Sequence, residues 1–179
     1  LASSAASDVY KRQATGWRKI GSTWYYLNPG NGDMATGWTT IGGTRYYMNQ
    51  DGAMVEGWSQ QNGTWYYLKP GSGNIATGWL KLGATWYYLA SDGKMLTGFQ
   101  NIGGSKYYLN TGSGAMVVGW LQLGSDWYYM NGSGAMLTGW QKIGSTWYYL
   151  NPTTGKMATG WTTVDGSKYY MNGSGAMPV

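Results

Sequence analysis

The sequence contains no cysteine and no histidine among its 179 residues. A disulfide framework is therefore excluded, and a zinc or copper site is not expected without either ligand. No stretch of about 18 residues is continuously apolar, so no membrane-spanning helix is predicted. Charged residues make up only 11% and the net charge is +5, with the basic residues scattered along the chain. A nucleic-acid-binding patch would need a basic run, and none is present.

The sequence is instead rich in glycine and in two aromatic residue types. The chain has 31 glycines, and aromatic residues make up 17%, almost all of them Trp and Tyr. Leu, Ile and Val are too sparse for an aliphatic core, so aromatic rings must supply most of the buried apolar area. Disordered chains are poor in aromatics, which excludes disorder as the explanation of the glycine content.

The aromatic residues follow an internal repeat of 20 or 21 residues. One mark of the repeat is Gly-Trp, which begins at Gly16, Gly37, Gly57, Gly78, Gly119, Gly139 and Gly160, with Gly98-Phe99 in the remaining slot. The other mark is Tyr-Tyr, at positions 25–26, 46–47, 66–67, 87–88, 107–108, 128–129, 148–149 and 169–170. A fixed period of this length is typical of a solenoid.

Each repeat is predicted to form one β-hairpin. In the first, residues 16–20 and 23–27 are aromatic or β-branched segments that flank the turn pair Gly21-Ser22. An isolated hairpin is barely stable, but stacked hairpins can bury their aromatic faces on one another. We therefore predict an all-β solenoid of about eight hairpins over residues 14–179. Residues 1–13 lack the apolar stretch of a signal peptide and are interpreted as a linker or a cloning remnant.

Strand alternation places Trp24 and Tyr26 on one face of the hairpin and Tyr25 and Leu27 on the other. We expect Tyr25, Leu27 and Ile20 to serve packing, and Trp17 to join Trp24. Two indoles, a phenol ring and a thioether suit a quaternary ammonium, which cannot donate a hydrogen bond and is held by ring faces. The residues alone leave open that the indoles only fill the core.

The pattern Gly-Trp-x5-6-Trp-Tyr-Tyr-Leu/Met followed by Gly-x-Met-x-Thr-Gly-Trp resembles the choline-binding repeat of streptococcal cell-surface proteins. The resemblance covers residues 14–179. It implies a left-handed superhelix with about three hairpins per turn. It also implies a secreted module, attached non-covalently to the cell wall through phosphocholine of teichoic and lipoteichoic acids. We expect no cofactor and no metal.

In the family, a site combines both tryptophans of one hairpin, the following methionine, and the second tyrosine of the next hairpin. The resemblance then implies five choline-binding sets: Trp17, Trp24, Met34 and Tyr47; Trp58, Trp65 and Tyr88; Trp79, Trp86, Met95 and Tyr108; Trp120, Trp127, Met136 and Tyr149; Trp140, Trp147, Met157 and Tyr170. In the second set Ile75 stands where methionine is usual, so its wall is expected to lack the thioether.

Three hairpins depart from the pattern, because Arg45, Lys106 and Lys168 replace the second tryptophan. A cation in that slot repels a second cation, and its head can lie against Trp38 or Trp161 as an internal substitute. We predict that the junctions between the second and third hairpins and between the fifth and sixth hairpins do not bind choline, and that the last hairpin cannot complete a site. The replacements recur every three hairpins, which predicts that they line one edge of the solenoid.

Three other functions compete with choline binding. Glucan-binding repeats resemble this unit, but sugar sites need polar side chains, and the acids Asp33, Asp51, Asp92 and Asp165 lie in turns. A structural spacer, or a homodimer formed through the terminal hairpins, is the second alternative. Catalysis is the least favoured, since no close acid pair or nucleophile–base pair is present. In this family catalysis belongs to a separate domain fused to the repeats.

Overall fold

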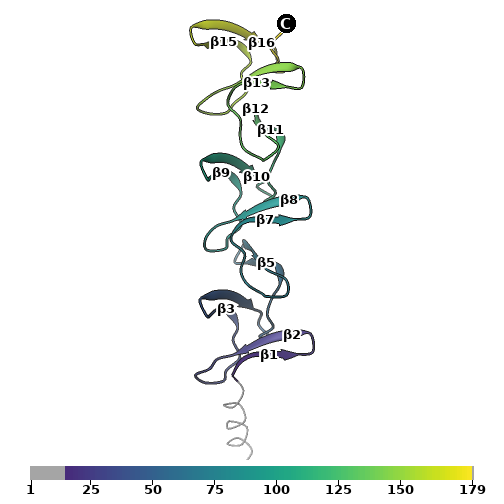
Figure 1. Cartoon of the computed structure of the whole chain (residues 1–179), viewed down its shortest axis with the longest axis vertical. Coiled ribbons are helices and arrows are strands. Elements are labelled where there is room, and N and C mark those ends of the chain that lie inside the picture. The colour runs from purple at the N-terminus through teal and green to yellow at the C-terminus, as the bar shows by residue number, and fades with distance from the viewer. Residues whose placement is uncertain (1–14, 179) are drawn as a thin grey trace, which may run out of the picture. The chain divides into compact units, whose positions relative to one another are not determined.

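The computed structural model describes residues 15–178, which form sixteen β-strands and no helix (Figure 1). Residues 1–13, interpreted above as a linker, lie outside the described residues. The strands, each of five residues, are β1 (Gly16–Ile20), β2 (Thr23–Leu27), β3 (Gly37–Ile41), β4 (Thr44–Met48), β5 (Gly57–Gln61), β6 (Thr64–Leu68), β7 (Gly78–Leu82), β8 (Thr85–Leu89), β9 (Gly98–Ile102), β10 (Ser105–Leu109), β11 (Gly119–Leu123), β12 (Asp126–Met130), β13 (Gly139–Ile143), β14 (Thr146–Leu150), β15 (Gly160–Val164) and β16 (Ser167–Met171).

Each odd-numbered strand pairs with the next strand in a two-stranded sheet, which confirms the predicted hairpins. In the first hairpin Trp17 stands opposite Tyr26 and Lys19 stands opposite Trp24, so these four side chains share one face. Two residues close each turn. Asn62 and Gly63 both have positive φ, at 48° and 77°, as a type I′ turn requires.

The core lies on the opposite face, at the last residue of each second strand. Seven side chains at this position have no exposed surface: Met48, Leu68, Leu89, Leu109, Met130, Leu150 and Met171. This confirms a packing role for the Leu27 position. Ile20 was expected to pack as well, but it is 67% exposed, whereas Val164 at the same place in the last hairpin is 8% exposed.

Successive hairpins are joined by a regular backbone ladder. The methionine after one hairpin donates its N–H to the second-strand tryptophan of the hairpin before, as Met54 does to the Trp24 carbonyl at 2.8 Å. Met157 repeats this bond to Trp127 at 2.8 Å. The same residue forms a β-bridge to its own hairpin, Met54 to Met48. The connecting segments that follow the second to the seventh hairpins are therefore each fixed to two hairpins at once.

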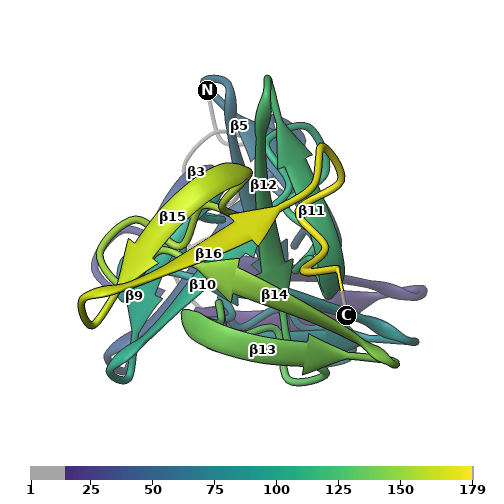
Figure 2. The same cartoon turned by 90° about the horizontal axis from the view of Figure 1, so that it is seen from above.

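The described chain forms two compact units, one of residues 15–80 and 89–95 and the other of residues 81–88 and 96–178. Within the second unit, the hairpins β11–β12, β13–β14 and β15–β16 point in three different directions when seen from above (Figure 2). Residues 15–178 include no helix long and apolar enough to cross a membrane.

Candidate functional site: aromatic cages

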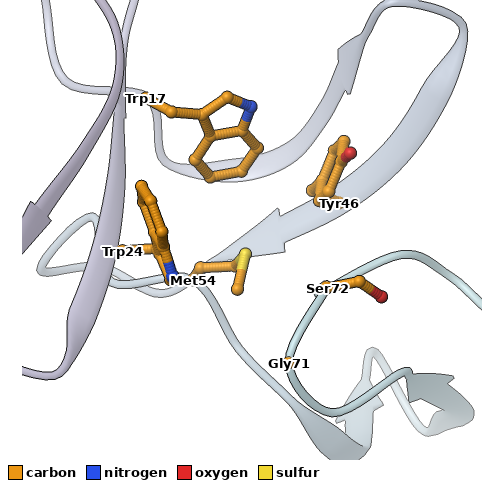
Figure 3. Close-up of a pocket in the computed structure, with 6 residues that line it drawn as sticks. All are labelled: Trp17, Trp24, Tyr46, Met54, Gly71 and Ser72. Atoms are coloured by element: carbon orange, nitrogen blue, oxygen red, sulfur yellow. The ribbon is translucent and has the colours of Figure 1, made fainter.

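Two tryptophans of the first hairpin form two walls of a pocket at a right angle to each other. The ring centroids of Trp17 and Trp24 are 6.2 Å apart and the ring planes meet at 87°. Tyr46, from β4 of the next hairpin, adds a third wall with its centroid 4.9 Å from that of Trp17. The cavity has a volume of about 250 Å³, and Figure 3 shows the residues that line it: Trp17, Trp24, Tyr46, Met54, Gly71 and Ser72.

The second unit contains a pocket of the same composition. Trp120 and Trp127 are 6.2 Å apart at 82°, and Tyr148 lies 4.8 Å from Trp120. This cavity has a volume of about 390 Å³ and is lined by Trp120, Trp127, Tyr148, Met157, Gly173 and Ser174. Equivalent residues of distant repeats thus build the same pocket twice. We call each such pocket a cage.

The tyrosine and the methionine of the first cage differ from those expected. Tyr47 was expected there, but it stands opposite Trp38 of its own hairpin, with ring centroids 5.0 Å apart. Tyr46 is one residue earlier and therefore points from the other face of the hairpin, toward Trp17. Met34 was also expected, but it lies against the loop at Gly52 and is 44% exposed. Met54 takes its place.

Other repeats differ from the expected sets in the same two ways, in the tyrosine and in the methionine. The second tyrosines pack on their own hairpins: Tyr108 on Phe99, Tyr149 on Trp140 and Tyr170 on Trp161, with centroids 5.0, 5.1 and 5.4 Å apart. The methionine-position residues bond to the preceding hairpin: Ile75 to Arg45, Met95 to Trp65, Met116 to Trp86, Met136 to Lys106, and Met157 to Trp127. Ile75 therefore belongs beside Arg45, and it does not deprive the Trp58–Trp65 pair of a thioether.

Two expected sets combine residues of both units. Trp58 and Trp65 are 6.4 Å apart at 90°, like the tryptophans of the cages, whereas Tyr88 belongs to the other unit. The set of Trp79, Trp86, Met95 and Tyr108 is likewise divided between the units. Choline binding at these two sets stays a prediction.

A third pair, Trp140 and Trp147, has most of a cage. The rings are 6.4 Å apart at 84°, and Tyr169 lies 4.8 Å from Trp140. Met177 donates its N–H to the Trp147 carbonyl at 2.9 Å, as Met54 does to Trp24. Within residues 15–178 no loop stands in the place that Gly71–Ser72 takes at the first cage.

That loop is the part of the cage that sequence reasoning missed. Gly71 and Ser72 follow the third hairpin, although the cage belongs to the first. The loop rests on the methionine, since a Cβ on Gly73 would collide with the Met54 thioether, and Gly73 has a φ of +67°. The available signal in the sequence is a glycine two residues before the methionine position of each repeat, such as Gly73 before Ile75. Periodicity alone does not show which hairpin the loop covers.

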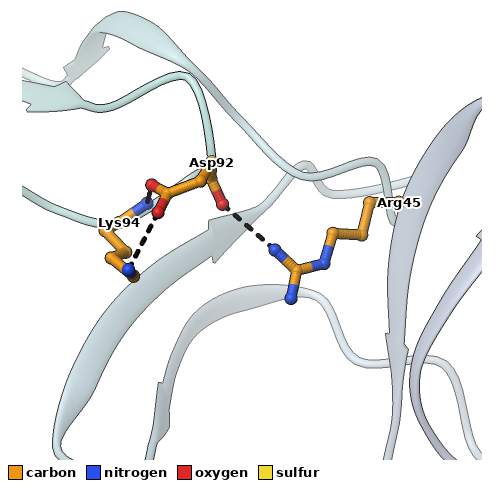
Figure 4. Close-up of polar contacts among 3 residues, drawn as sticks. All are labelled: Arg45, Asp92 and Lys94. Atoms are coloured by element: carbon orange, nitrogen blue, oxygen red, sulfur yellow. Dashed lines mark hydrogen bonds and ion pairs between the residues drawn. The ribbon is translucent and has the colours of Figure 1, made fainter.

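Arg45 fills the equivalent position in the second hairpin. Its guanidinium carbon lies 4.0 Å from the centroid of the Trp38 ring, and Tyr66 supplies the third wall at 4.7 Å from Trp38. Arg45 also donates a hydrogen bond of 3.2 Å to the Asp92 carbonyl in a later loop (Figure 4). The predicted internal cation is confirmed here. Lys106 does the same over Phe99, at 4.8 Å.

The charged groups next to Arg45 are paired in the same loop. Lys94 forms an ion pair of 2.9 Å with Asp92. The hydrogen bond from Lys94 lowers the pKa of Asp92, and the same bond raises the pKa of Lys94. The Asp92 carboxylate is therefore already neutralised by Lys94, and Arg45 uses the backbone carbonyl of that residue.

The aromatic pockets and the repeat register together match one family. Its profile, described as choline-binding repeat, matches residues 35–78, 76–119 and 117–159, and a related profile, putative cell wall binding repeat, matches residues 15–34 and 159–177. The chain belongs to the choline-binding repeat family. A comparison with curated protein sequences gives no match.

Solved structures from Streptococcus pneumoniae carry the same repeat. This choline-binding array is 40% identical to CbpJ over 92% of its length, with a TM-score of 0.88, and spans 65% of that protein. It is 40% identical to choline binding protein F over 93% of its length, with a TM-score of 0.83, and spans 58% of that chain. The choline-binding domain of CbpL is 31% identical over 92% of the array, which spans 87% of that domain, with a TM-score of 0.66. The chain thus spans less than two thirds of the first two relatives.

Proposed function

We propose that the chain binds choline and phosphocholine in its cages, and that it attaches a larger protein to a choline-bearing polymer. The observation that carries the proposal is the cage itself, which occurs with the same composition in both units. Two perpendicular indoles, a phenol ring and a thioether surround each cavity, and no carboxylate or amide side chain is among the lining residues.

This lining matches the chemistry of a trimethylammonium group. Such a group carries a positive charge spread over methyl groups, so ring faces attract it and hydrogen-bond acceptors give it little. Each ring contributes about 0.5–2 kcal/mol, depending on desolvation. A single cage therefore binds weakly, and several cages on one chain gain avidity on a polymer with many choline groups.

The proposed ligand-binding residues follow the geometry of the cages. They are Trp17, Trp24, Tyr46 and Met54 in the first unit, and Trp120, Trp127, Tyr148 and Met157 in the second, with Trp140, Trp147, Tyr169 and Met177 as a third set. Arg45 and Lys106 hold their own aromatic pockets and exclude an external cation.

The relatives support a cationic ligand. Choline binding protein F has been crystallised in complex with ipratropium, which is itself a quaternary ammonium. The polymer that would carry phosphocholine is teichoic or lipoteichoic acid, which places the array at the cell surface outside the membrane. A sugar ligand is less well served, since besides the tyrosine hydroxyl and the indole N–H groups one serine is the only hydrogen-bonding side chain among the lining residues of each cage.

Calorimetric titration with choline chloride, tetramethylammonium and glucose tests the proposal. Five hairpins carry both tryptophans, which predicts a stoichiometry near five for both ammonium ions and no heat with glucose. Trp17→Ala and Trp120→Ala should each remove one equivalent. Trp161→Ala is the matched control, because Trp161 is 74% exposed and no later hairpin covers it within residues 15–178. Binding of glucose or dextran without a response to choline would move the array to the carbohydrate-binding class.

A further inference from the structure

The hairpins of the two cages differ in the side chain that stands opposite the second tryptophan. In the first hairpin Lys19 stands directly across the strand pair from Trp24, and its Nζ lies 5.6 Å from the centroid of the Trp24 ring. In the hairpin of the second cage the residue opposite Trp127 is Gln122. The Gln122 amide donates to the Gly124 carbonyl at 3.2 Å, so it is turned toward its own β-turn.

The same division extends to other hairpins that carry both tryptophans. Lys81 lies 5.5 Å from the centroid of the Trp86 ring, and Lys142 stands opposite Trp147. Gln60 stands opposite Trp65 and turns to the Gly63 carbonyl at 3.4 Å, as Gln122 does in its hairpin. The array therefore contains lysine-type and glutamine-type cages.

Lys19 is exposed, and it takes part in neither of the ion pairs within residues 15–178, which join Lys94 to Asp92 and Lys156 to Asp126. Its charge acts in opposite directions on two related ligands. Choline is a cation, and a second cation beside the Trp24 wall repels it. Phosphocholine carries the same trimethylammonium with a phosphate two carbons away, and a lysine at the rim attracts that phosphate.

We infer that Lys19 is a specificity residue that makes the first cage prefer phosphocholine over free choline, whereas the Gln122 cage does not discriminate between them. The inference rests on the proposed function, because it concerns the ligand of the same cage. Lys19 acts through charge at the rim, and the ring walls still hold the ammonium group. Lys142, which stands opposite Trp147, has the same role in its own hairpin.

The magnitude is that of an exposed ion pair. Such pairs contribute about 0.2–1 kcal/mol, which corresponds to about a 1.4- to 5-fold change in Kd. The effect should weaken when the salt concentration rises from about 0.02 to 0.5 M, because the shorter Debye length screens the exposed Lys19 charge. The ring contacts carry no such salt dependence.

The test compares two reciprocal variants of the full chain, Lys19→Gln and Gln122→Lys. Titrations with choline and with phosphocholine are followed by the indole N–H resonances of Trp24 and Trp127 in ¹⁵N-labelled protein, so both cages are read in one sample. Lys19→Gln should lower the preference of the Trp24 cage for phosphocholine about 1.4- to 5-fold. Gln122→Lys should create that preference at Trp127, while the unmutated cage in each variant stays unchanged.

Three results separate the possibilities. An unchanged preference in both variants, with choline still bound, overturns the inference and leaves the proposed function intact. Tighter binding of both ligands by Lys19→Gln also overturns it, since Lys19 would then only compete for the Trp24 ring. No response of either indole to either ligand contradicts the proposed function itself. Glycerophosphocholine and phosphatidylcholine vesicles, compared at equal phosphocholine concentration, distinguish a soluble diester from a lipid headgroup as the source of the group.

Discussion

Replacing Arg45 with tryptophan should remove the guanidinium group from the second hairpin's aromatic pocket and allow choline to bind there instead. Arg45 occupies the position of Trp24, with its guanidinium carbon 4.0 Å from the Trp38 ring centroid, and Tyr66 already stands 4.7 Å from Trp38. Two walls of a cage are thus present around Arg45, Trp38 from the second hairpin and Tyr66 from the third. Arg45→Trp supplies the remaining indole, and we expect one additional equivalent of choline in calorimetric titration.

Arg45→Trp should destabilise the protein only when choline is absent. Arg45 contributes a cation–π contact of about 0.5–1 kcal/mol at an exposed site. Its hydrogen bond to the Asp92 carbonyl adds about 0.5–1.5 kcal/mol. We therefore expect Arg45→Trp to lower the free energy of unfolding of ligand-free protein by about 1–2.5 kcal/mol. Choline at about 100 times its Kd returns about 2.7 kcal/mol per site, which restores the loss.

Urea unfolding with and without choline measures both effects. Arg45→Gln is the control: it removes the cation without adding an indole, so it should lose stability and gain no choline equivalent. Because Ile75 stands at the methionine position of this pocket, the double variant Arg45→Trp, Ile75→Met tests whether a thioether is also needed. A folded double variant that binds no additional choline would refute the view that Arg45 fills a cage.

Two further changes act on the loops. Gly73→Ala should destabilise the protein by about 1–3 kcal/mol and weaken choline binding at the first cage, because the new Cβ would collide with the Met54 thioether and because Gly73 has a positive φ. Urea unfolding and choline titration measure the two effects. Gly30→Ala is the control, since a Cβ at Gly30 would meet no other atom within 4 Å. The lowered pKa of Asp92 stabilises the fold above the ordinary carboxyl pKa, and this contribution is lost as the pH falls through the lowered value. Asp92→Asn should therefore reduce the difference between urea midpoints at pH 7 and pH 3, and a difference equal to that of the parent chain would exclude the Asp92–Lys94 pair as its source.

The hairpins and the tryptophan walls could be predicted from the sequence because both depend on local rules. A two-residue turn fixes the register of a hairpin, and the register places Trp17 and Trp24 on one face. The placement of the Arg45 cation against Trp38 could be predicted because Arg45 takes the repeat position of Trp24. These features require knowledge of only one repeat at a time.

The tyrosine and methionine could not be assigned in this way. Tyr46 and Tyr47 are adjacent, and only the stacking of one hairpin behind another decides which of them reaches Trp17. That stacking is set by the bond from the Met54 N–H to the Trp24 carbonyl, which joins residues thirty positions apart. Tyr25 and its equivalents were expected to pack the core, and Tyr46 and Tyr148 instead line the two cages.

The first cage draws its lining from three hairpins: the tryptophans from the first, Tyr46 and Met54 from the second and its connection, and Ser72 from the loop after the third. A ligand in this cage contacts all three, so its binding free energy opposes the separation of any of them. In a repeat array, stability is a sum of intrinsic repeat terms and neighbour interfaces. Choline thus strengthens the interfaces, whereas Arg45 strengthens its own interface without ligand. A choline-filled cage and an internal cation therefore both stabilise the weak packing between neighbouring two-stranded sheets. Which of the two a hairpin carries determines how strongly that part of the array depends on choline for its stability.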